Sequence, residues 1–262
     1  MRFSSEQVRK ISDDLYDAWL SRTPIPRMTQ IYGDFSQEDA YEIQKVFIGR
    51  QIAAGQTPAG KKIGLTSKAM RDLVHINEPD YGTIFFEQCF GSDTELDSAA
   101  FIIPRVEAEI LFKLKRGLDR PGVTPEDVAD ATEYVTAAFE IIDNRYTIQD
   151  QKIVDSIADN AAFGACIMGD VPKRVDELDL RSLGFVMEKN HKQVCTGSGA
   201  AVMGNPLNAM VWLAEKMIQL GDPLKANELV LSGSIVAAVD VAPGDHLCGR
   251  FGPLGEVNVS FR

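Results

Sequence analysis

Apolar side chains recur at helical spacing in the first part of the chain. Ser4 and Gln7 have the pattern of a capping box, and behind them follow Val8, Ile11, Leu15 and Trp19. Ser36 can cap a second run, which consists of Ala40, Ile43, Val46 and Phe47. The two patterns predict an N-terminal helical cap over residues 1–58.

From residue 59 the pattern changes to short β segments that are separated by glycine and proline turns. The expected strands lie at 61–67, 83–88, 101–114, 136–143, 164–169, 183–190, 228–234, 246–251 and 256–261. Helices interrupt them after Thr124 and between Asn205 and Gly221. Many short strands around few helices predict an α+β fold, with a coiled or barrel-like mixed sheet as the catalytic domain, residues 59–262.

Charge and composition exclude several classes of protein. The chain has 262 residues, of which 27 are Lys or Arg and 38 are Asp or Glu, so its formal net charge is −11. An acidic chain without a basic stripe repels a phosphate backbone, which argues against nucleic acid as a partner. The N-terminus has no signal region, and no stretch approaches the roughly 20 apolar residues that span a membrane. We therefore expect a cytoplasmic protein with no membrane partner.

Cysteine and histidine are few and scattered. The four cysteines contain no CxxC pair, and the three histidines lie far apart. This spacing argues against a zinc site and against a disulfide framework, so we expect reduced thiols. Residues 197–201 lack the spacing of a nucleotide-binding loop, which argues against a nicotinamide cofactor.

Three glutamates stand out within apolar strands. Alternation along the segment 105–112 places Glu107 and Glu109 on one face, and Glu140 interrupts the apolar segment 137–143. Three converging carboxylates repel one another unless a divalent ion neutralises them, and oxygen ligands favour Mg²⁺ or Mn²⁺. The alternative is a solvated strand face, with Glu140 paired to a lysine.

A second window contains two adjacent lysines. Strand alternation places Lys61 and Lys62 on opposite faces, so that one of them can point inward. An inward lysine that lies beside a metal ion and in a low dielectric has its ammonium form disfavoured, which is how a lysine becomes a proton donor or acceptor near neutral pH. The alternative is a pair of surface lysines.

Other polar segments have two interpretations each. Asp80, in the turn-like segment 77–82, is either a turn former or a base on a loop. Asp155 and the pair Asp159 and Asn160 have the positions of helix caps. Residues 232–234 offer two hydroxyls to an anion such as a substrate carboxylate, or form an ordinary bulge.

Taken together, eight segments resemble, in the same order over nearly the whole chain, the hydratase and decarboxylase branch of the fumarylacetoacetate hydrolase superfamily. They are KKIGLTSKAM, NEPDYG, PRVEAEI, FEIIDNRY, ADNAAFG, GSGAAVMGNP, LVLSGS and PGD. The resemblance implies a mixed β-roll core of the C-terminal type of that superfamily, with an N-terminal helical cap. It also implies a homo-oligomer.

The resemblance assigns roles residue by residue. Glu107, Glu109 and Glu140 correspond to the metal ligands of the family, and Lys62 corresponds to its active-site lysine. Asp80 corresponds to the acid of its EPDYG-like loop. The residues near the substrate correspond to Leu65, Asp159, Asn160, Ser232 and Ser234. A substrate with a second carboxylate would need a cation at its far end, which Arg71 or Arg145 could supply.

The function implied is that of a lyase which adds water to a 2-hydroxy-2,4-dienoate and gives a 4-hydroxy-2-oxoacid, in meta-cleavage degradation of aromatic compounds. Lys62 would move protons on the enolate side, and Asp80 would orient or deprotonate the water. Residues 234–246 are more similar to the decarboxylases, so a 4-oxalocrotonate decarboxylase is the alternative. A second alternative is an inactive assembly partner of a sister enzyme.

Overall fold

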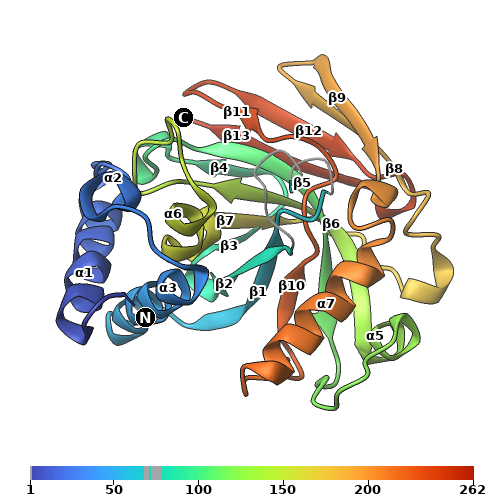
Figure 1. Ribbon diagram of the computed structural model, residues 1–262. Coiled ribbons are helices and arrows are strands. Elements are labelled where there is room, and N and C mark those ends of the chain that lie inside the picture. Colours follow the sequence, from blue (N-terminus) through green and yellow to red (C-terminus); the bar gives the residue numbers. More distant parts are fainter. Residues whose placement is uncertain (1, 68–70, 72–77) are drawn as a thin grey trace.

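Two mixed β-sheets form the body of the protein in the computed structural model, which describes residues 2–67, 71 and 78–262 (Figure 1). The larger sheet has the strand order β2 (Asp80–Phe85), β1 (Pro58–Gly64), β10 (Leu229–Leu231), β5 (Arg105–Leu114), β6 (Thr132–Ile142), β7 (Phe163–Met168) and β3 (Cys89–Gly91), and β11 (Val239–Asp240) pairs with β5. The smaller sheet has the order β4 (Thr94–Leu96), β13 (Glu256–Phe261), β12 (His246–Arg250), β8 (Gly184–Lys189) and β9 (Lys192–Ser198). Parallel pairs such as β1 with β10 stand beside antiparallel ones, which confirms the expected α+β fold with a mixed sheet.

The helices form two groups at opposite ends of the larger sheet (Figure 1). One group consists of α1 (Ser5–Ser21), α2 (Met28–Tyr32), α3 (Gln37–Ala53) and α6 (Ile153–Ala158), and the other of α5 (Pro125–Ala131) and α7 (Pro206–Gln219). Short 3₁₀ turns lie at Phe86–Gln88, Ser98–Ala100, Asn160–Ala162, Val175–Glu177, Gly199–Ala201 and Gly252–Leu254. None of the described helices is long and apolar enough to cross a membrane.

Local sequence signals explain where the longer helices begin. Ser4 and Gln7 form the expected capping box of α1, and Ser36 caps α3 with Asp39 as its partner. Thr124 and Asn205 cap α5 and α7, in each case just before a proline at the first helical position. These caps satisfy backbone donors that the first turn of a helix leaves free.

The larger sheet separates apolar and charged side chains by face. The main core lies between the two sheets and α7, and β5 contributes to it Val106, Ala108, Ile110 and Phe112. Because side chains alternate along a strand, Glu107 and Glu109 face the other way, beside a small apolar cluster that includes Leu111, Ala138 and Leu231. The strong packing of the main core therefore fixes which face receives the glutamates.

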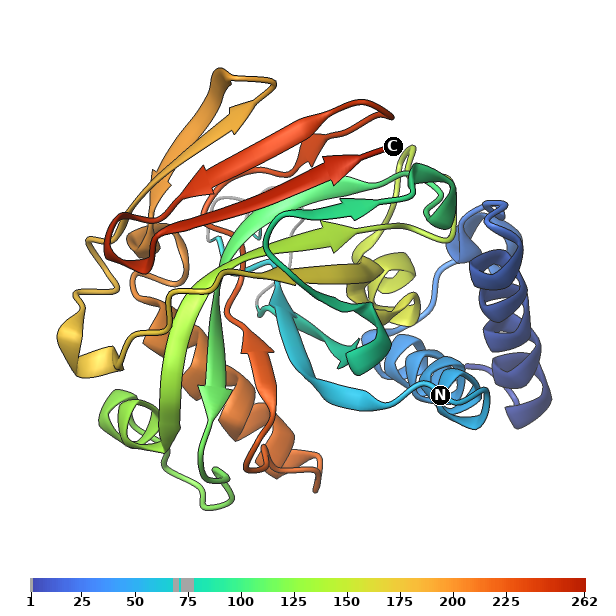
Figure 2. The ribbon, with the colours of Figure 1, turned by 180° about the vertical axis from the view of Figure 1, so that it is seen from behind.

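A second core lies under the N-terminal helices, which Figure 2 shows from behind at the side of the sheets. Its members from α1 and α3 include Leu15 and Phe47, and it also contains Tyr146 and Ile157, which come from a much later segment. The helical cap is thus completed by α6. The division of the chain at residue 58 stays a prediction.

The structure differs from the sequence-based expectation in short elements. The pattern did not predict β3, β4, β9, β11 and α2, which have two to seven residues each and lie mostly at sheet edges. The first expected strand starts earlier and ends at Gly64, because Leu65 adopts a left-handed φ of 57°. Asp80 is the first residue of β2 and pairs with Gly64, so its expected place in a turn or loop was wrong.

The close approach of β1 and β10 leaves no room for a side chain at Gly60. A Cβ at this position would lie 1.8 Å from the carbonyl oxygen of Leu229, whereas a Cβ at Gly49 in α3 would meet nothing within 4 Å. We expect Gly60→Ala to lower the free energy of unfolding by about 1–3 kcal/mol through overpacking. Gly49→Ala should raise it by about 0.5–1 kcal/mol, because alanine favours the helix. Urea unfolding of both variants checks this; a stable Gly60→Ala protein would contradict the described strand pairing.

Candidate metal centre and active site

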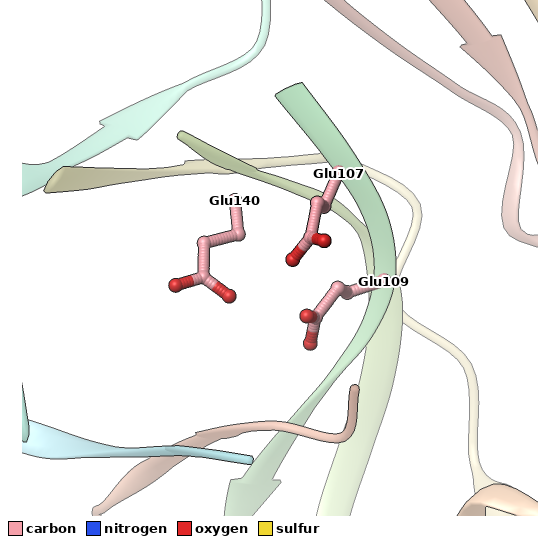
Figure 3. A group of neighbouring side chains, drawn as sticks. All are labelled: Glu107, Glu109 and Glu140. Carbon is pink, nitrogen blue, oxygen red and sulfur yellow. The ribbon is translucent and has the colours of Figure 1, made fainter. Parts of the chain in front are cut away.

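The backbone pairing of two strands brings three glutamates together. Glu107 on β5 lies directly opposite Glu140 on β6, and Glu109 follows two residues along the same face of β5. One carboxylate oxygen from each residue lies within 4.8 Å of the others. Figure 3 shows the carboxyl groups of the three side chains turned toward a common space. The structure thus gathers all three residues that the sequence singled out as metal ligands.

These carboxylates strongly favour a neutralising partner. Glu109 and Glu140 are fully buried, and Glu107 is partly exposed. Burial raises the pKa of Glu140 to about 7 and that of Glu109 well above its ordinary value, where the charges of Glu140 and Glu107 add to the effect. At separations within 4.8 Å, two carboxylate charges repel by about 3.5 kcal/mol or more for an effective dielectric constant of about 20.

Unused oxygen atoms show that the cluster fits a cation. Within the described part of the chain, Oε1 of Glu109 and both carboxylate oxygens of Glu140 have no hydrogen bond, although all three atoms are buried. The backbone N–H of Gly233 donates to the remaining oxygen, Oε2 of Glu109, at 2.7 Å. A set of hard carboxylate oxygens without soft ligands suits Mg²⁺ or Mn²⁺.

Lys62 is the inward lysine of its pair. Its side chain is almost fully buried, with Nζ at 3.1 Å from Oε1 of Glu140 and 2.9 Å from the carbonyl oxygen of Ala161. Lys61 points to the other face of β1, where it lies 3.6 Å from Asp222. The expected alternation is confirmed, and Glu140 has both a lysine partner and the two other glutamates around it.

The expected disfavouring of the Lys62 ammonium presupposes a neighbouring metal ion and stays a prediction. Burial opposes its ammonium form, but the charges of Glu140, Asp80, Glu107 and Glu109 outweigh burial and raise the pKa of Lys62. The amine is therefore protonated when the carboxylates are charged. A divalent ion on the three glutamates would weaken this attraction, because it neutralises the same charges.

Asp80 shares the face of Lys62. It opposes Gly64 across the β1–β2 pair, and Gly64 lies two residues after Lys62 on β1. Its carboxylate is buried, and Oδ1 has no hydrogen-bond partner among the described residues. Burial raises the pKa of Asp80, against the opposing charge of Lys62. A Cβ at position 64 would lie 2.0 Å from Oδ1, so only glycine leaves room for this carboxylate.

The segment after β10 contributes backbone and hydroxyl groups. Ser232 is fully buried, and its hydroxyl oxygen has no hydrogen-bond partner within the described part of the chain. Gly233 has a φ of 108°, and a Cβ there would lie 2.3 Å from Thr66, so this turn needs glycine. The Ser234 hydroxyl donates to the carbonyl of Val236 at 2.5 Å. Of the two predicted hydroxyls, Ser232 is thus the one left for a ligand.

The remaining predicted site residues are engaged by the protein itself. The Asn160 side chain accepts from the backbone N–H of Thr83 and donates to its carbonyl oxygen. Asp159 is buried and ion-paired with Arg145. Leu65 lies at the end of β1, where its carbonyl oxygen accepts from the Arg71 guanidinium at 2.8 Å.

Arg145 is one of the two arginines that the sequence offers as a cation for a second substrate carboxylate. The structure contradicts this, because Arg145 is only 2% exposed and its guanidinium is committed to Asp159 and Phe163. Asp155 does have the expected capping role, since its carboxylate accepts from Lys152 N at 3.0 Å and from Thr29 N at 2.8 Å. Parts of two motifs, residues 68–70 and 77, lie outside the described residues.

Two groups near Lys62 and Glu109 were not found from the sequence. They are the carbonyl of Ala161 and the backbone N–H of Gly233, which act through the main chain. A side-chain pattern does not reveal such contacts. The signals in the sequence nearest to these two groups are the pair Asp159 and Asn160, just before Ala161, and the position of Gly233 between two serines.

Comparisons with known proteins place the chain among enzymes of one kind. It is 38% identical to a 2-keto-4-pentenoate hydratase of Paraburkholderia xenovorans over 98% of this chain and 95% of the relative. It is 38% identical to a 2-hydroxyhexa-2,4-dienoate hydratase of Comamonas testosteroni, with 94% of each chain covered. No protein-family model matches the chain.

A solved structure is similar over almost the entire chain. It is a 4-oxalocrotonate decarboxylase from Pseudomonas putida G7, complexed with magnesium and adipate. The TM-score is 0.95, the sequence identity is 35%, and 99% of each chain is covered. This chain is therefore similar in sequence to hydratases and in structure to a decarboxylase.

Metal binding should stabilise the protein through the three glutamates. At a Mg²⁺ concentration one hundred times the dissociation constant, the gain is about 2.7 kcal/mol, because a ligand that binds the folded state shifts the unfolding equilibrium. Glu109→Gln should remove most of the rise in melting temperature that Mg²⁺ causes. The matched control is Glu133→Gln, an exposed glutamate on β6, which should keep the rise. An equal rise in all three proteins would contradict the assignment.

Proposed function

The chain belongs to the hydratase and decarboxylase branch of the fumarylacetoacetate hydrolase superfamily, and we propose that it is a metal-dependent hydratase. The proposed reaction adds water to a 2-hydroxy-2,4-dienoate and gives a 4-hydroxy-2-oxoacid, in meta-cleavage degradation of aromatic compounds. The relatives that cover nearly the whole chain bear hydratase names, which supports water addition as the reaction.

The observation that carries the proposal is the common face of five charged side chains. Glu107, Glu109 and Glu140 converge there, with Lys62 in contact with Glu140 and Asp80 on the neighbouring strand. Such a face combines a site for a divalent cation with a proton donor, Lys62, and with a further carboxylate, that of Asp80. Acid–base chemistry beside a metal requires these groups together.

The three glutamates would hold Mg²⁺ or Mn²⁺, since their carboxylates converge and the buried Oε1 of Glu109 and Oε2 of Glu140 have no partner among the described residues. When bound, such a cation supplies Lewis-acid stabilisation of the negative charge that develops on the 2-oxo oxygen of the substrate. The buried hydroxyl of Ser232 would donate to the substrate carboxylate. The cation would also let a protein with a formal net charge of −11 bind an anionic substrate.

Lys62 and Asp80 would divide the proton transfers. The ammonium of Lys62 stands between Ala161 and Glu140, where it can deliver a proton to the carbon skeleton on the enolate side and recover it. Asp80 keeps one carboxylate oxygen free of described partners, so it can orient water or take its proton. Its raised pKa makes it a stronger base than an exposed aspartate.

Decarboxylation of 4-oxalocrotonate is the second candidate. The observation in its favour is the TM-score of 0.95 with a decarboxylase whose structure contains magnesium. Loss of CO₂ from a vinylogous β-keto acid needs the same stabilisation of negative charge but no added water. The role of Asp80 therefore separates the two reactions.

We also propose that the chain is a homo-oligomer, as the resemblance implies, and that it acts in the cytoplasm. An inactive assembly partner of a sister hydratase or decarboxylase is the remaining alternative. The retained set of Glu107, Glu109, Glu140 and Lys62 argues for an active enzyme, because an inactive partner would not need these buried charges.

The direct test of the proposed function is turnover of a defined substrate. The protein with Mg²⁺ should consume freshly generated 2-hydroxypenta-2,4-dienoate and form the 4-hydroxy-2-oxoacid, which NMR identifies. The same preparation with 4-oxalocrotonate should release little CO₂. Rapid CO₂ release without water addition would identify a decarboxylase instead, and no turnover of either substrate would favour the inactive partner.

Lys62→Met tests the proton-transfer role. We expect kcat to fall about 10²–10⁴-fold, the contribution of a positioned general acid or base. Calorimetric Mg²⁺ affinity should change much less. The control is Lys61→Met, on the opposite face of β1, which should retain turnover. Loss of folding in Lys62→Met would point to a structural role for this lysine.

Asp80→Asn distinguishes water addition from decarboxylation. If Asp80 handles water, hydration should fall about 10²–10⁴-fold while Mg²⁺ still binds. A variant with full hydratase activity would exclude Asp80 as the water-handling group.

A further inference from the structure

The turn that contacts Lys62 has an unusual backbone. Asn160, Ala161 and Ala162 have φ values of 53°, 49° and 60°, so three consecutive residues other than glycine are left-handed. Each such residue costs about 1–2 kcal/mol, because its Cβ approaches the following carbonyl. The middle residue, Ala161, presents its carbonyl oxygen to the Lys62 ammonium at 2.9 Å. The surrounding structure must hold the turn in this conformation.

Arg145 holds the turn from both sides. Its guanidinium donates to the carbonyl oxygen of Asp159, the residue before the turn, and to that of Phe163, the residue after it. Its backbone N–H and its Nε donate to the two carboxylate oxygens of Asp159. Four hydrogen bonds from one residue thus fix both ends of the left-handed segment.

Arg145 does this without facing the reacting groups. It is 2% exposed, and the ring of Phe47 from α3 lies under its guanidinium, with 5.7 Å between the guanidinium carbon and the ring centre. Among the described residues, the hydrogen bonds that its guanidinium and backbone N–H donate go to Asp159 and Phe163. The planar fork of arginine can reach two carbonyls at once, which the single ammonium of lysine does not reproduce.

We propose that Arg145 is a positioning residue for Lys62, which it controls through the carbonyl of Ala161. The lysine has a flexible four-carbon stem, and its ammonium needs more than one anchor to stay in place. Glu140 attracts it from the metal side, and Ala161 holds it from the other side. With the Ala161 carbonyl displaced, the ammonium would move toward the carboxylates. The inference rests on the proposed function, because it concerns proton transfer by Lys62.

A second contact offers an independent way to displace the same turn. Asn160 binds both backbone groups of Thr83, and Gly82 leaves space for this approach. A Cβ at Gly82 would lie 2.5 Å from the carbonyl oxygen of Asn160. Gly82→Ala should therefore push the turn away from β2 while leaving Arg145 unchanged.

The experiment measures kcat, KM and Mg²⁺ affinity for Arg145→Lys. This variant keeps the positive charge beside Asp159 and loses the fork. A misplacement of about 1 Å costs about a hundredfold in rate, so kcat should fall by ten- to a hundredfold. KM and the Mg²⁺ dissociation constant should stay within about threefold, because the three glutamates are untouched.

The Gly82→Ala variant should show the same split between kcat and KM. In the double variant the two losses should not multiply, because both changes displace one turn. The control for general destabilisation is Ser12→Ala, which removes two buried hydrogen bonds inside the cap and should leave kcat unchanged. Should Arg145→Lys fail to fold, Arg145→Gln takes its place, because it keeps one amide donor near the turn and loses the fork that reaches both carbonyls.

A crystal structure of Arg145→Lys gives a readout that needs no turnover. The expected result is a displaced Ala161 carbonyl that no longer contacts Lys62. The proposal would be overturned if both single variants kept the kcat of the wild-type protein, or if the two losses in kcat multiplied in the double variant. It would also be overturned if Lys62 had not moved in the crystal structure of Arg145→Lys. If the wild-type protein turned over neither substrate, the proposed function would fail, and the position of Lys62 in the crystal would still decide whether Arg145 positions it.

Discussion

The repulsion among three buried carboxylates is the constraint on which the site depends. Glu107 and Glu140 lie directly opposite each other on neighbouring strands, where like charges destabilise a sheet. Glu109 adds a third charge within 4.8 Å. Lys62 contributes one positive charge to this cluster, which leaves it anionic when all three glutamates are charged. A divalent cation is the partner that balances the remaining charge with oxygen ligands alone.

The fold tolerates this cluster because its stability comes from elsewhere. The opposite face of the same strands is buried in the main core, with Val106, Ala108 and Ile110 fully inaccessible. Since alternation is fixed by the pleat, burying these apolar residues forces the glutamates onto one surface. The energy of the core thus maintains an arrangement that the charges by themselves would oppose.

A second layer of contacts controls the groups around the cluster. The helix α6 leads into the segment that Arg145 and Asn160 hold, and this segment supplies the carbonyl for Lys62. Phe47 of α3 packs against Arg145, and Gln44 of α3 donates to the carbonyl oxygens of Tyr81 on β2 and Ile157 on α6, so the N-terminal helices contact the elements that hold the site. The cap therefore acts on the geometry of the site without contributing a group to it among the described contacts.

The sequence predicted the parts of this arrangement that periodicity encodes. The caps at Ser4 and Ser36, the two faces of β5 and the opposite directions of Lys61 and Lys62 all follow from spacing, whereas the choice of Lys62 as the inward lysine follows from the resemblance. The pairing register that sets Glu107 against Glu140 is a long-range property, and no local pattern specifies it. The short strands β3 and β11 were not predicted, because two or three residues are too few to show the alternation of a strand. The role of Arg145 was misjudged because its partner Asp159 is close only in the fold.

The central claim is that Glu107, Glu109 and Glu140 together hold one divalent cation. A crystal structure of the protein grown with Mn²⁺, with data collected at the manganese absorption edge, tests it most directly. The account predicts a single strong anomalous peak within coordinating distance of all three carboxylates. A peak elsewhere, or three carboxylates that remain without an ion at saturating Mn²⁺, would contradict it.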